Sequence, residues 1–199
     1  MNKLFAMPPK RLPTQAAEGL PRWRWTVAEI ERVAQSGLFS EYDRFELLGG
    51  EIVPMSPEGR RHETVRTRLI DYFVRRLPQT IMLSPDAQFN LSDDTFAEPD
   101  ILLHSTAIQT YDLRPADALL VVEIAETSFR YDIKSKMALY AEHGVPEYWV
   151  IHAPSLVTTI HRQPSQGTYL LIREFPSSAK LVPLLVPELA VSLATLTLD

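Results

Sequence analysis

Hydrophobic and polar positions along the chain follow two spacings, one typical of helices and one typical of strands. The run ALLVVEIA over residues 118–125 is almost continuously apolar, which is the pattern of a strand covered on both faces. Thr26 and Glu29 have the spacing of a capping box and predict that a helix begins there. The Gly49–Gly50 pair between two short apolar segments predicts a hairpin.

The order of the predicted elements indicates the fold class. Strands and helices alternate along the chain instead of occurring in separate runs. We therefore expect an α+β domain of α/β/α layers, with a mixed central β-sheet flanked by helices. The predicted helices cover 27–35, 62–77 and 131–143, and the predicted strands cover 45–48, 51–55, 81–83, 88–91, 97–103, 118–125, 147–152, 157–162 and 169–174.

The N-terminal segment differs in composition from the rest. Residues 1–22 contain few large apolar side chains and the prolines Pro8, Pro9, Pro13 and Pro21. We expect a flexible N-terminal arm over 1–22 and one folded domain over 23–199. The sequence shows neither a secretory signal nor an apolar run of membrane-spanning length, so we expect a soluble, cytoplasmic protein with no membrane partner.

Composition and charge narrow the function classes. The chain has no cysteine, which excludes disulfides, thiolate metal sites and a cysteine nucleophile. Its net charge of −5 is unfavourable for tight non-specific binding to nucleic acid. A local basic stripe or a bound divalent metal would offset that charge, so a nuclease is not excluded.

Two acidic residues stand out because they lie in or next to apolar strands. Glu123 interrupts the most apolar strand, where an unpaired carboxylate costs several kcal/mol, roughly. It must be protonated, salt-bridged or bound to a metal. Asp100 begins another apolar strand, and two acids on neighbouring strands repel unless a cation lies between them. Oxygen ligands of this kind suit Mg²⁺ or Mn²⁺.

Three further side chains allow two interpretations each. Lys136 follows Asp132 by four residues, which fits a surface ion pair or an ammonium group directed at the acidic site. His62 and Arg66 fall on the apolar side of a predicted helix, near its N-terminal end. They fit hydrogen-bonded core residues or contacts to a substrate phosphate.

Four sequence blocks, which span roughly residues 25–195, resemble the Uma-two family, a domain of unknown function grouped with restriction endonucleases. The blocks are FELLGGEI followed by Met55-Ser56-Pro57, then EPDI at 98–101, LVVEI at 120–124, and Asp132, Lys136, Tyr140 and Gly144 at intervals of four followed by VPEYW. That family is similar in fold to the PD-(D/E)XK nucleases, which cleave phosphodiester bonds with Mg²⁺.

The resemblance implies an endonuclease that hydrolyses DNA with Mg²⁺ as cofactor, and Mn²⁺ suits the same oxygen ligands. Because cleavage of both DNA strands needs two sites, we expect a homodimer. The implied catalytic residues are Asp100, Glu123, Lys136 and Glu46. The implied metal ligands are Asp100 and Glu123, to which we add the carbonyl of Ile124. The expected substrate contacts are His62, Arg66 and Tyr140.

The sequence departs from the superfamily pattern at two positions. Ala125 stands where a strict E-x-K motif has lysine, so the resemblance assigns that role to Lys136 on the following helix. Glu126 stands where the family usually has serine, and it adds a carboxylate to the site. These departures keep an alternative open, a catalytically inactive nuclease-like fold that serves as a binding or assembly module.

Overall fold

The computed structural model describes residues 23–39, 44–55, 57–126 and 135–196 of the chain. The predicted N-terminal arm, 1–22, lies outside the described residues, as does the beginning of the helix predicted over 131–143. Within the described residues, the α-helices are α1 (Val27–Gln35), α2 (Arg60–Val74) and α4 (Met137–Glu142), and 3-10 helices lie at Thr110–Asp112, Pro115–Asp117, Pro187–Leu189 and Leu193–Thr195. The strands are β1 (Phe45–Leu48), β2 (Glu51–Pro54), β3 (Ile81–Ser84), β4 (Phe89–Ser92), β5 (Thr95–Ala97), β6 (Ile101–Ser105), β7 (Leu120–Ala125), β8 (Glu147–His152), β9 (Thr158–Ser165) and β10 (Thr168–Phe175).

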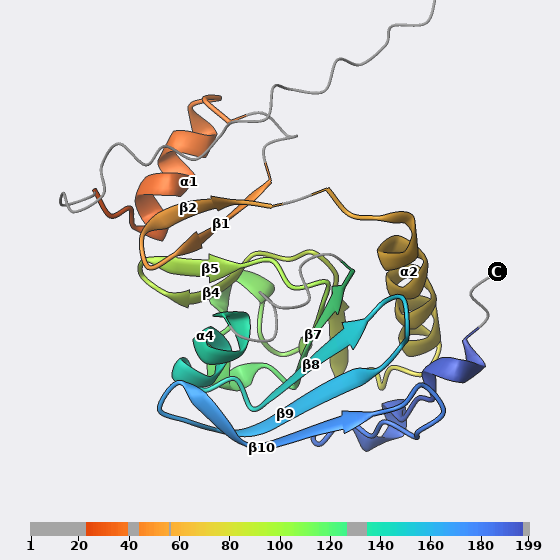
Figure 1. Cartoon of the computed structure of the whole chain (residues 1–199). Coiled ribbons are helices and arrows are strands. Elements are labelled where there is room, and N and C mark those ends of the chain that lie inside the picture. Colours follow the sequence, from red (N-terminus) through yellow and green to blue (C-terminus); the bar gives the residue numbers. More distant parts are fainter. Residues whose placement is uncertain (1–22, 40–43, 56, 127–134, 197–199) are drawn as a thin grey trace, which may run out of the picture.

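The strands form two sheets (Figure 1). A six-stranded sheet has the order β10-β9-β8-β7-β6-β3, and a four-stranded sheet has the order β2-β1-β5-β4. The larger sheet is mixed, because β7 and β8 run parallel while its other neighbouring strands are antiparallel. Parallel neighbours need a crossover connection, and the connection from β7 to β8 carries α4. The predicted α+β fold with a mixed central sheet is confirmed.

Helices cover both faces of the larger sheet. On one face, α2 packs through Val65, Leu69 and Phe73, which are fully buried. Burial of each such side chain contributes about 1.5–3 kcal/mol. On the other face, α4 packs through Tyr140 and Ala141. This is the predicted α/β/α layering, and β7 lies in the centre of it.

The strand predicted over 97–103 is wrong in one respect, because the segment forms two strands in two different sheets. β5 pairs with β1 and β4, whereas β6 pairs with β3 and β7. The physical reason is Pro99, which has no N–H to donate to a strand ladder. As a result, Glu98 and Asp100 lie at the junction between the two sheets.

The second helix begins and ends earlier than predicted. α2 starts at Arg60 after the N-cap Gly59, and its C-cap is Arg75. Pro78 disfavours helical geometry in the residue before it, which is consistent with an end before Leu77. His62 is therefore the third residue of α2 and lies in its first turn. None of the helices in the described ranges is both long and apolar enough to cross a membrane.

Candidate active site

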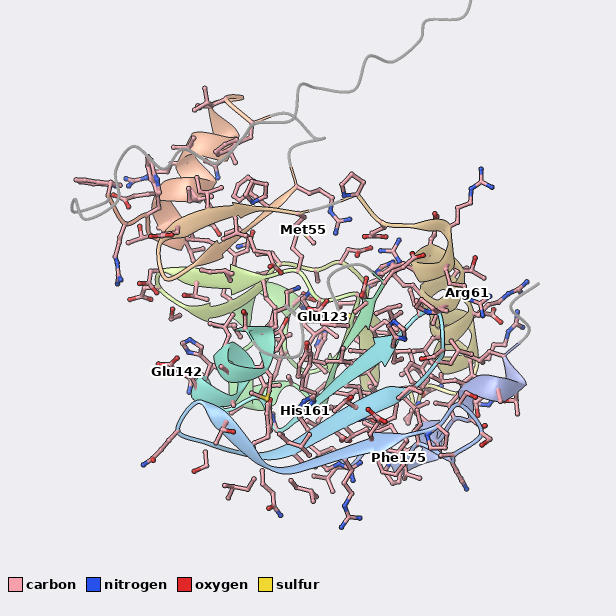
Figure 2. The ribbon with its side chains drawn as sticks, viewed as in Figure 1. Met55, Arg61, Glu123, Glu142, His161 and Phe175 are labelled. Carbon is pink, nitrogen blue, oxygen red and sulfur yellow. The ribbon has the colours of Figure 1, made fainter. Side chains whose placement is uncertain are left out.

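A buried lysine lies between two buried carboxylates. The Nζ atom of Lys136 is 2.8 Å from Oε1 of Glu123 and 2.9 Å from Oε1 of Glu46. The hydroxyl of Tyr140 also donates to Oε1 of Glu123, at 3.1 Å. We call these four residues the lysine cluster. Figure 2 shows Glu123 in the interior of the molecule, among packed side chains.

Strand alternation brings the lysine cluster together. Val121 and Ala125 of β7 pack on the α4 face of the sheet, so Glu123 between them points to the same face. Lys136 lies in a π-helical turn directly before α4, a geometry that often marks functional sites. Lys136 is only 5 % exposed, so the interpretation of this lysine as part of a surface ion pair is wrong. Asp132, its proposed partner, lies outside the described residues.

Tyr140 remains a hydrogen-bond donor in this setting. Burial raises the pKa of its hydroxyl well above the usual value, and the charges of Glu123 and Glu46 raise it further. Tyr140 therefore stays protonated and donates a hydrogen bond to Glu123. For Glu123, the structure shows the salt-bridged state among the alternatives that the sequence left open.

A second group of side chains surrounds Asp100. Its Oδ2 atom accepts the backbone N–H of Ile124 at 2.6 Å, and both of its oxygens lie 3.1 Å from Nε2 of His62. Oε2 of Glu58 is 3.3 Å from Nδ1 of the same ring. We call Glu58, His62 and Asp100 the histidine cluster. Each member offers a metal-ligating atom, and these atoms all lie within 4.8 Å of one another.

The histidine cluster is the only such group of three among the described residues, and Glu123 is not part of it. Backbone N–H groups nevertheless connect the two clusters. The N–H that Asp100 accepts belongs to Ile124, the residue after Glu123. Likewise, the N–H of Glu98, two residues before Asp100, donates to Oε1 of Glu46 at 3.2 Å. The structure thus places Asp100 and Glu123 in adjacent clusters with different partners.

Two arginines connect the histidine cluster to further acids. Arg44 is 2.8 Å from Glu58 and also contacts Asp86 and Glu98. Arg66 is 2.6 Å from Asp86, 3.3 Å from Glu58 and 4.0 Å from Oδ1 of Asp100. Burial raises the pKa of both Asp86 and Glu98, although the nearby arginines oppose that rise. Arg66, an expected substrate contact, is therefore held by carboxylates in this structure.

The ionisation of His62 reflects two opposing influences. Burial lowers the pKa of the imidazole, whereas the hydrogen bond and charge of Asp100, together with the charge of Glu58, raise it by more. The net result is a pKa above the usual value. His62 is 7 % exposed and is thus a core residue in contact with carboxylates, at the end of α2 that faces the sheet junction.

Glu126, the departure from the family pattern, lies at the beginning of α2. Its Oε2 atom accepts the backbone N–H of His62 at 3.4 Å. A Cβ atom at position 59 would overlap that same oxygen, so the carboxylate rests against Gly59. A negative charge at a helix N-terminus is favourable, so Glu126 has a structural role there.

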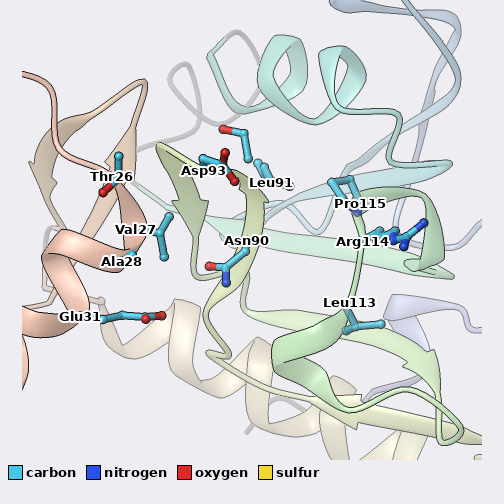
Figure 3. A pocket seen from close by; sticks show the side chains of 11 residues that line it. Thr26, Val27, Ala28, Glu31, Asn90, Leu91, Asp93, Leu113, Arg114 and Pro115 are labelled. Atoms are coloured by element: carbon cyan, nitrogen blue, oxygen red, sulfur yellow. The ribbon is translucent and has the colours of Figure 1, made fainter.

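Sequence reasoning missed Glu58, Arg44 and Asp86. Glu58 precedes His62 by four residues, a spacing at which side chains meet on a helix, and this was the available signal. Arg44 and Asp86 carry no such signal, because their contacts depend on how the two sheets meet. A separate open hollow of about 600 Å³ lies between α1, β4 and residues 113–115 (Figure 3). No member of either cluster lines it.

The family assignment follows from the sequence match to a family model. Residues 27–196 match the model of the Uma-two family (Uma2), described as "Putative restriction endonuclease". The chain belongs to the Uma-two family. The match covers all members of both clusters, from Glu46 to Tyr140.

A solved structure supports the fold. The chain is similar to a protein from Anabaena variabilis ATCC 29413, described as a "putative nuclease belonging to DUF820". The TM-score is 0.67 at 16 % sequence identity, and the match covers 85 % of this chain and 96 % of the other. At this identity the similarity shows that the two chains share a fold. No curated protein matches the chain in sequence.

Proposed function

We propose that the chain is a metal-dependent endonuclease that hydrolyses phosphodiester bonds of DNA, with Asp100, Glu123, Lys136 and Glu46 as its catalytic residues. One observation carries the proposal. A buried lysine bridges Glu46 and Glu123 beside the carboxylate of Asp100, in a chain whose family is grouped with restriction endonucleases. These are the four residues that the family resemblance assigns to catalysis.

The charge of the site fits a divalent cation. Besides His62 and Tyr140, the two clusters and the arginine network that joins them contain six carboxylates and three cationic side chains: Glu46, Glu58, Asp86, Glu98, Asp100 and Glu123 with Arg44, Arg66 and Lys136. Buried carboxylates need compensating charge, and carboxylate oxygens suit Mg²⁺ or Mn²⁺. A bound ion would polarise the scissile phosphate and lower the pKa of a bound water.

The proposed metal ligands are Asp100, Glu123 and the carbonyl of Ile124. Ile124 directs its N–H toward Asp100, and the C=O of a strand residue points to the same side as its N–H. The register of β6 and β7 ends with Ile101 opposite Val122, and its extension by two residues would set Pro99, which has no N–H to donate, opposite Ile124. This arrangement supports an Ile124 carbonyl that faces Asp100 and is available to a ligand.

The remaining side chains act by position and charge. Lys136 would stabilise negative charge that develops on the phosphate, since its ammonium is fixed between two carboxylates. Tyr140 orients Glu123 through its hydroxyl. His62 and Arg66 lie at the start of α2, where we propose that substrate phosphate is bound. The proposal includes a homodimer, because cleavage of both DNA strands needs two sites. It also places the protein in the cytoplasm.

Incubation of supercoiled plasmid with the protein and Mg²⁺ or Mn²⁺ tests the proposal. We expect nicked and linear products, and their loss on addition of EDTA or in the Asp100→Asn variant. Asp71→Asn is the matched control, because Asp71 is an exposed acid on α2 that pairs with Arg75. Its activity should equal that of the wild type. If plasmid is not nicked with either metal, and calorimetry detects no metal binding, the inactive binding or assembly module is the better description.

A further inference from the structure

We propose that His62 is a ligand, through Nε2, of the metal ion that Asp100 holds, and that Glu58 orients its ring, so that the site prefers a divalent transition-metal ion to Mg²⁺. This inference deepens the proposed function and rests on its metal site at Asp100. It assigns His62 to the metal ion in place of a direct contact with the substrate phosphate. Glu58 comes from the segment before α2, His62 from the first turn of α2, and Asp100 from the junction between β5 and β6.

The distances match those between neighbouring ligands of one ion. Two atoms that each lie about 2.2 Å from an ion, at right angles, are about 3.1 Å apart. Nε2 of His62 is 3.1 Å from Oδ1 of Asp100. The other oxygen of Asp100 is engaged by the N–H of Ile124, at 2.6 Å. Asp100 is thus anchored through Oδ2, which also lies 3.1 Å from Nε2, while Oδ1 accepts no backbone hydrogen bond and shares the approach to the imidazole.

The imidazole has a nitrogen that the protein does not satisfy. Nδ1 of His62 is buried and has no hydrogen-bond partner among the residues that the structure describes. Oε2 of Glu58 is its nearest acidic atom, at 3.3 Å, but without the geometry of a hydrogen bond. If Nε2 binds an ion, the ring proton resides on Nδ1 and faces Glu58. A carboxylate on the far nitrogen of a ligating histidine is the usual way in which proteins orient that ring.

The charge around the histidine cluster leaves room for one dication. Four carboxylates and two guanidinium groups make up this network: Glu58, Asp86, Glu98 and Asp100 with Arg44 and Arg66. The excess of two negative charges equals the charge of one divalent ion. His62 enters this balance as a neutral ligand, as metal coordination requires.

A nitrogen ligand changes which metals bind best. Mg²⁺ favours oxygen ligands and retains its water, whereas imidazole suits first-row transition-metal ions. A site formed by carboxylates alone would accept Mg²⁺ and Mn²⁺ on similar terms. A site that includes His62 should bind Mn²⁺ more tightly than Mg²⁺.

Pulsed electron paramagnetic resonance of the Mn²⁺-loaded full-length protein tests this inference directly, because it detects ¹⁴N bound to the ion. We expect a ¹⁴N coupling in the wild type and its loss in His62→Gln. In a Mn²⁺ titration, His62→Gln should raise the dissociation constant at least about tenfold. The dissociation constant for Mg²⁺ should change less, so the preference for Mn²⁺ should shrink.

His143→Gln is the matched control, because His143 caps the C-terminus of α4 and belongs to neither cluster. It should keep both the ¹⁴N coupling and the Mn²⁺ affinity. Absence of ¹⁴N coupling in the wild type, or its persistence in His62→Gln, would overturn the inference. If His62→Gln does not fold, absence of the coupling in the wild type still overturns the inference. Its presence supports the inference, because His62 is the only histidine in a metal-ligating group among the described residues.

The two proposals fail in different ways. Plasmid nicking by a protein whose bound Mn²⁺ shows no ¹⁴N coupling would refute the role of His62 and leave the nuclease proposal standing. Bound Mn²⁺ with ¹⁴N coupling but without nicking would support the histidine ligand and refute the nuclease activity.

Discussion

The ammonium group of Lys136 lies 2.8 Å from the carboxylate of Glu123, although the two residues are 13 positions apart in the sequence. Both side chains are buried, and Glu46 of the other sheet contacts the same ammonium group. This contact joins β7, the helix that follows it, and the smaller sheet at one point.

Lys136→Met should destabilise the metal-free protein by about 3–5 kcal/mol, because it leaves two buried carboxylates without their cation. Added Mg²⁺ or Mn²⁺ should restore part of the loss, since an ion that binds only the folded state stabilises it. Urea unfolding with EDTA and with metal measures both effects. Lys180→Met, at an exposed lysine, should behave like the wild type. Equal unfolding midpoints for Lys136→Met and the wild type would contradict the prediction.

Tyr140→Phe should cost more stability than Tyr169→Phe. Each variant removes one buried hydroxyl, but Tyr140 donates to the charged Glu123 and Tyr169 donates to the carbonyl of Val145. Hydrogen bonds to charged groups contribute about 1.5–3 kcal/mol, against about 0.5–1.5 kcal/mol for neutral pairs. Unfolding free energies in urea give the comparison. A larger loss in Tyr169→Phe would show that Tyr140 does not support Glu123.

Arg162→Met should destabilise the protein without weakening metal binding. Glu147 is fully buried and accepts hydrogen bonds from Arg162, from the indole of Trp149 and from the backbone of Leu184. Loss of the arginine charge should cost about 3–5 kcal/mol. Because Glu147 and Arg162 belong to neither cluster, calorimetric Mn²⁺ affinity should stay unchanged. A parallel loss of metal affinity would mean that stability and metal binding cannot be separated in this fold.

Acidification should destabilise the protein through His161. Burial lowers the pKa of this histidine, while its hydrogen bond to the carbonyl of Tyr148 opposes the shift in part. With a folded pKa below the unfolded one, the unfolded state binds more protons, so stability falls as the pH drops below about 6.5. His161→Phe removes this contribution and retains an aromatic ring beside Tyr148 and Tyr169.

Urea unfolding at pH 7.5 and pH 5.5 measures the effect for both proteins. The loss of stability between the two pH values should be smaller in His161→Phe than in the wild type. His62, whose pKa is raised, contributes in the opposite direction in both proteins, so the difference between them isolates His161. An identical loss in the two proteins would contradict the prediction.

The sequence predicted those parts of the site that depend on local pattern. Glu123 was identifiable because a carboxylate in an apolar strand needs a partner, and His62 because helical periodicity placed it on the buried side. Their partners were not predictable in this way, since Asp100 lies 38 residues from His62 and its position depends on the strand break at Pro99. Lys136 was assigned by the family resemblance, because its spacing alone favours a surface ion pair.

The connection between the parallel strands β7 and β8 has a consequence for the order of folding. β8 can pair with β7 only after the intervening chain has crossed one face of the sheet, and that chain carries Lys136 and Tyr140. The pairing of β8 with β7 therefore also places the ammonium group of Lys136 next to Glu123. Before that step, burial of the Glu123 carboxylate without its lysine is unfavourable in free energy. This desolvation cost disfavours burial of β7 before β8 and Lys136 are in place. Site assembly and sheet closure are thus expected to be a single cooperative event in the folding of this protein.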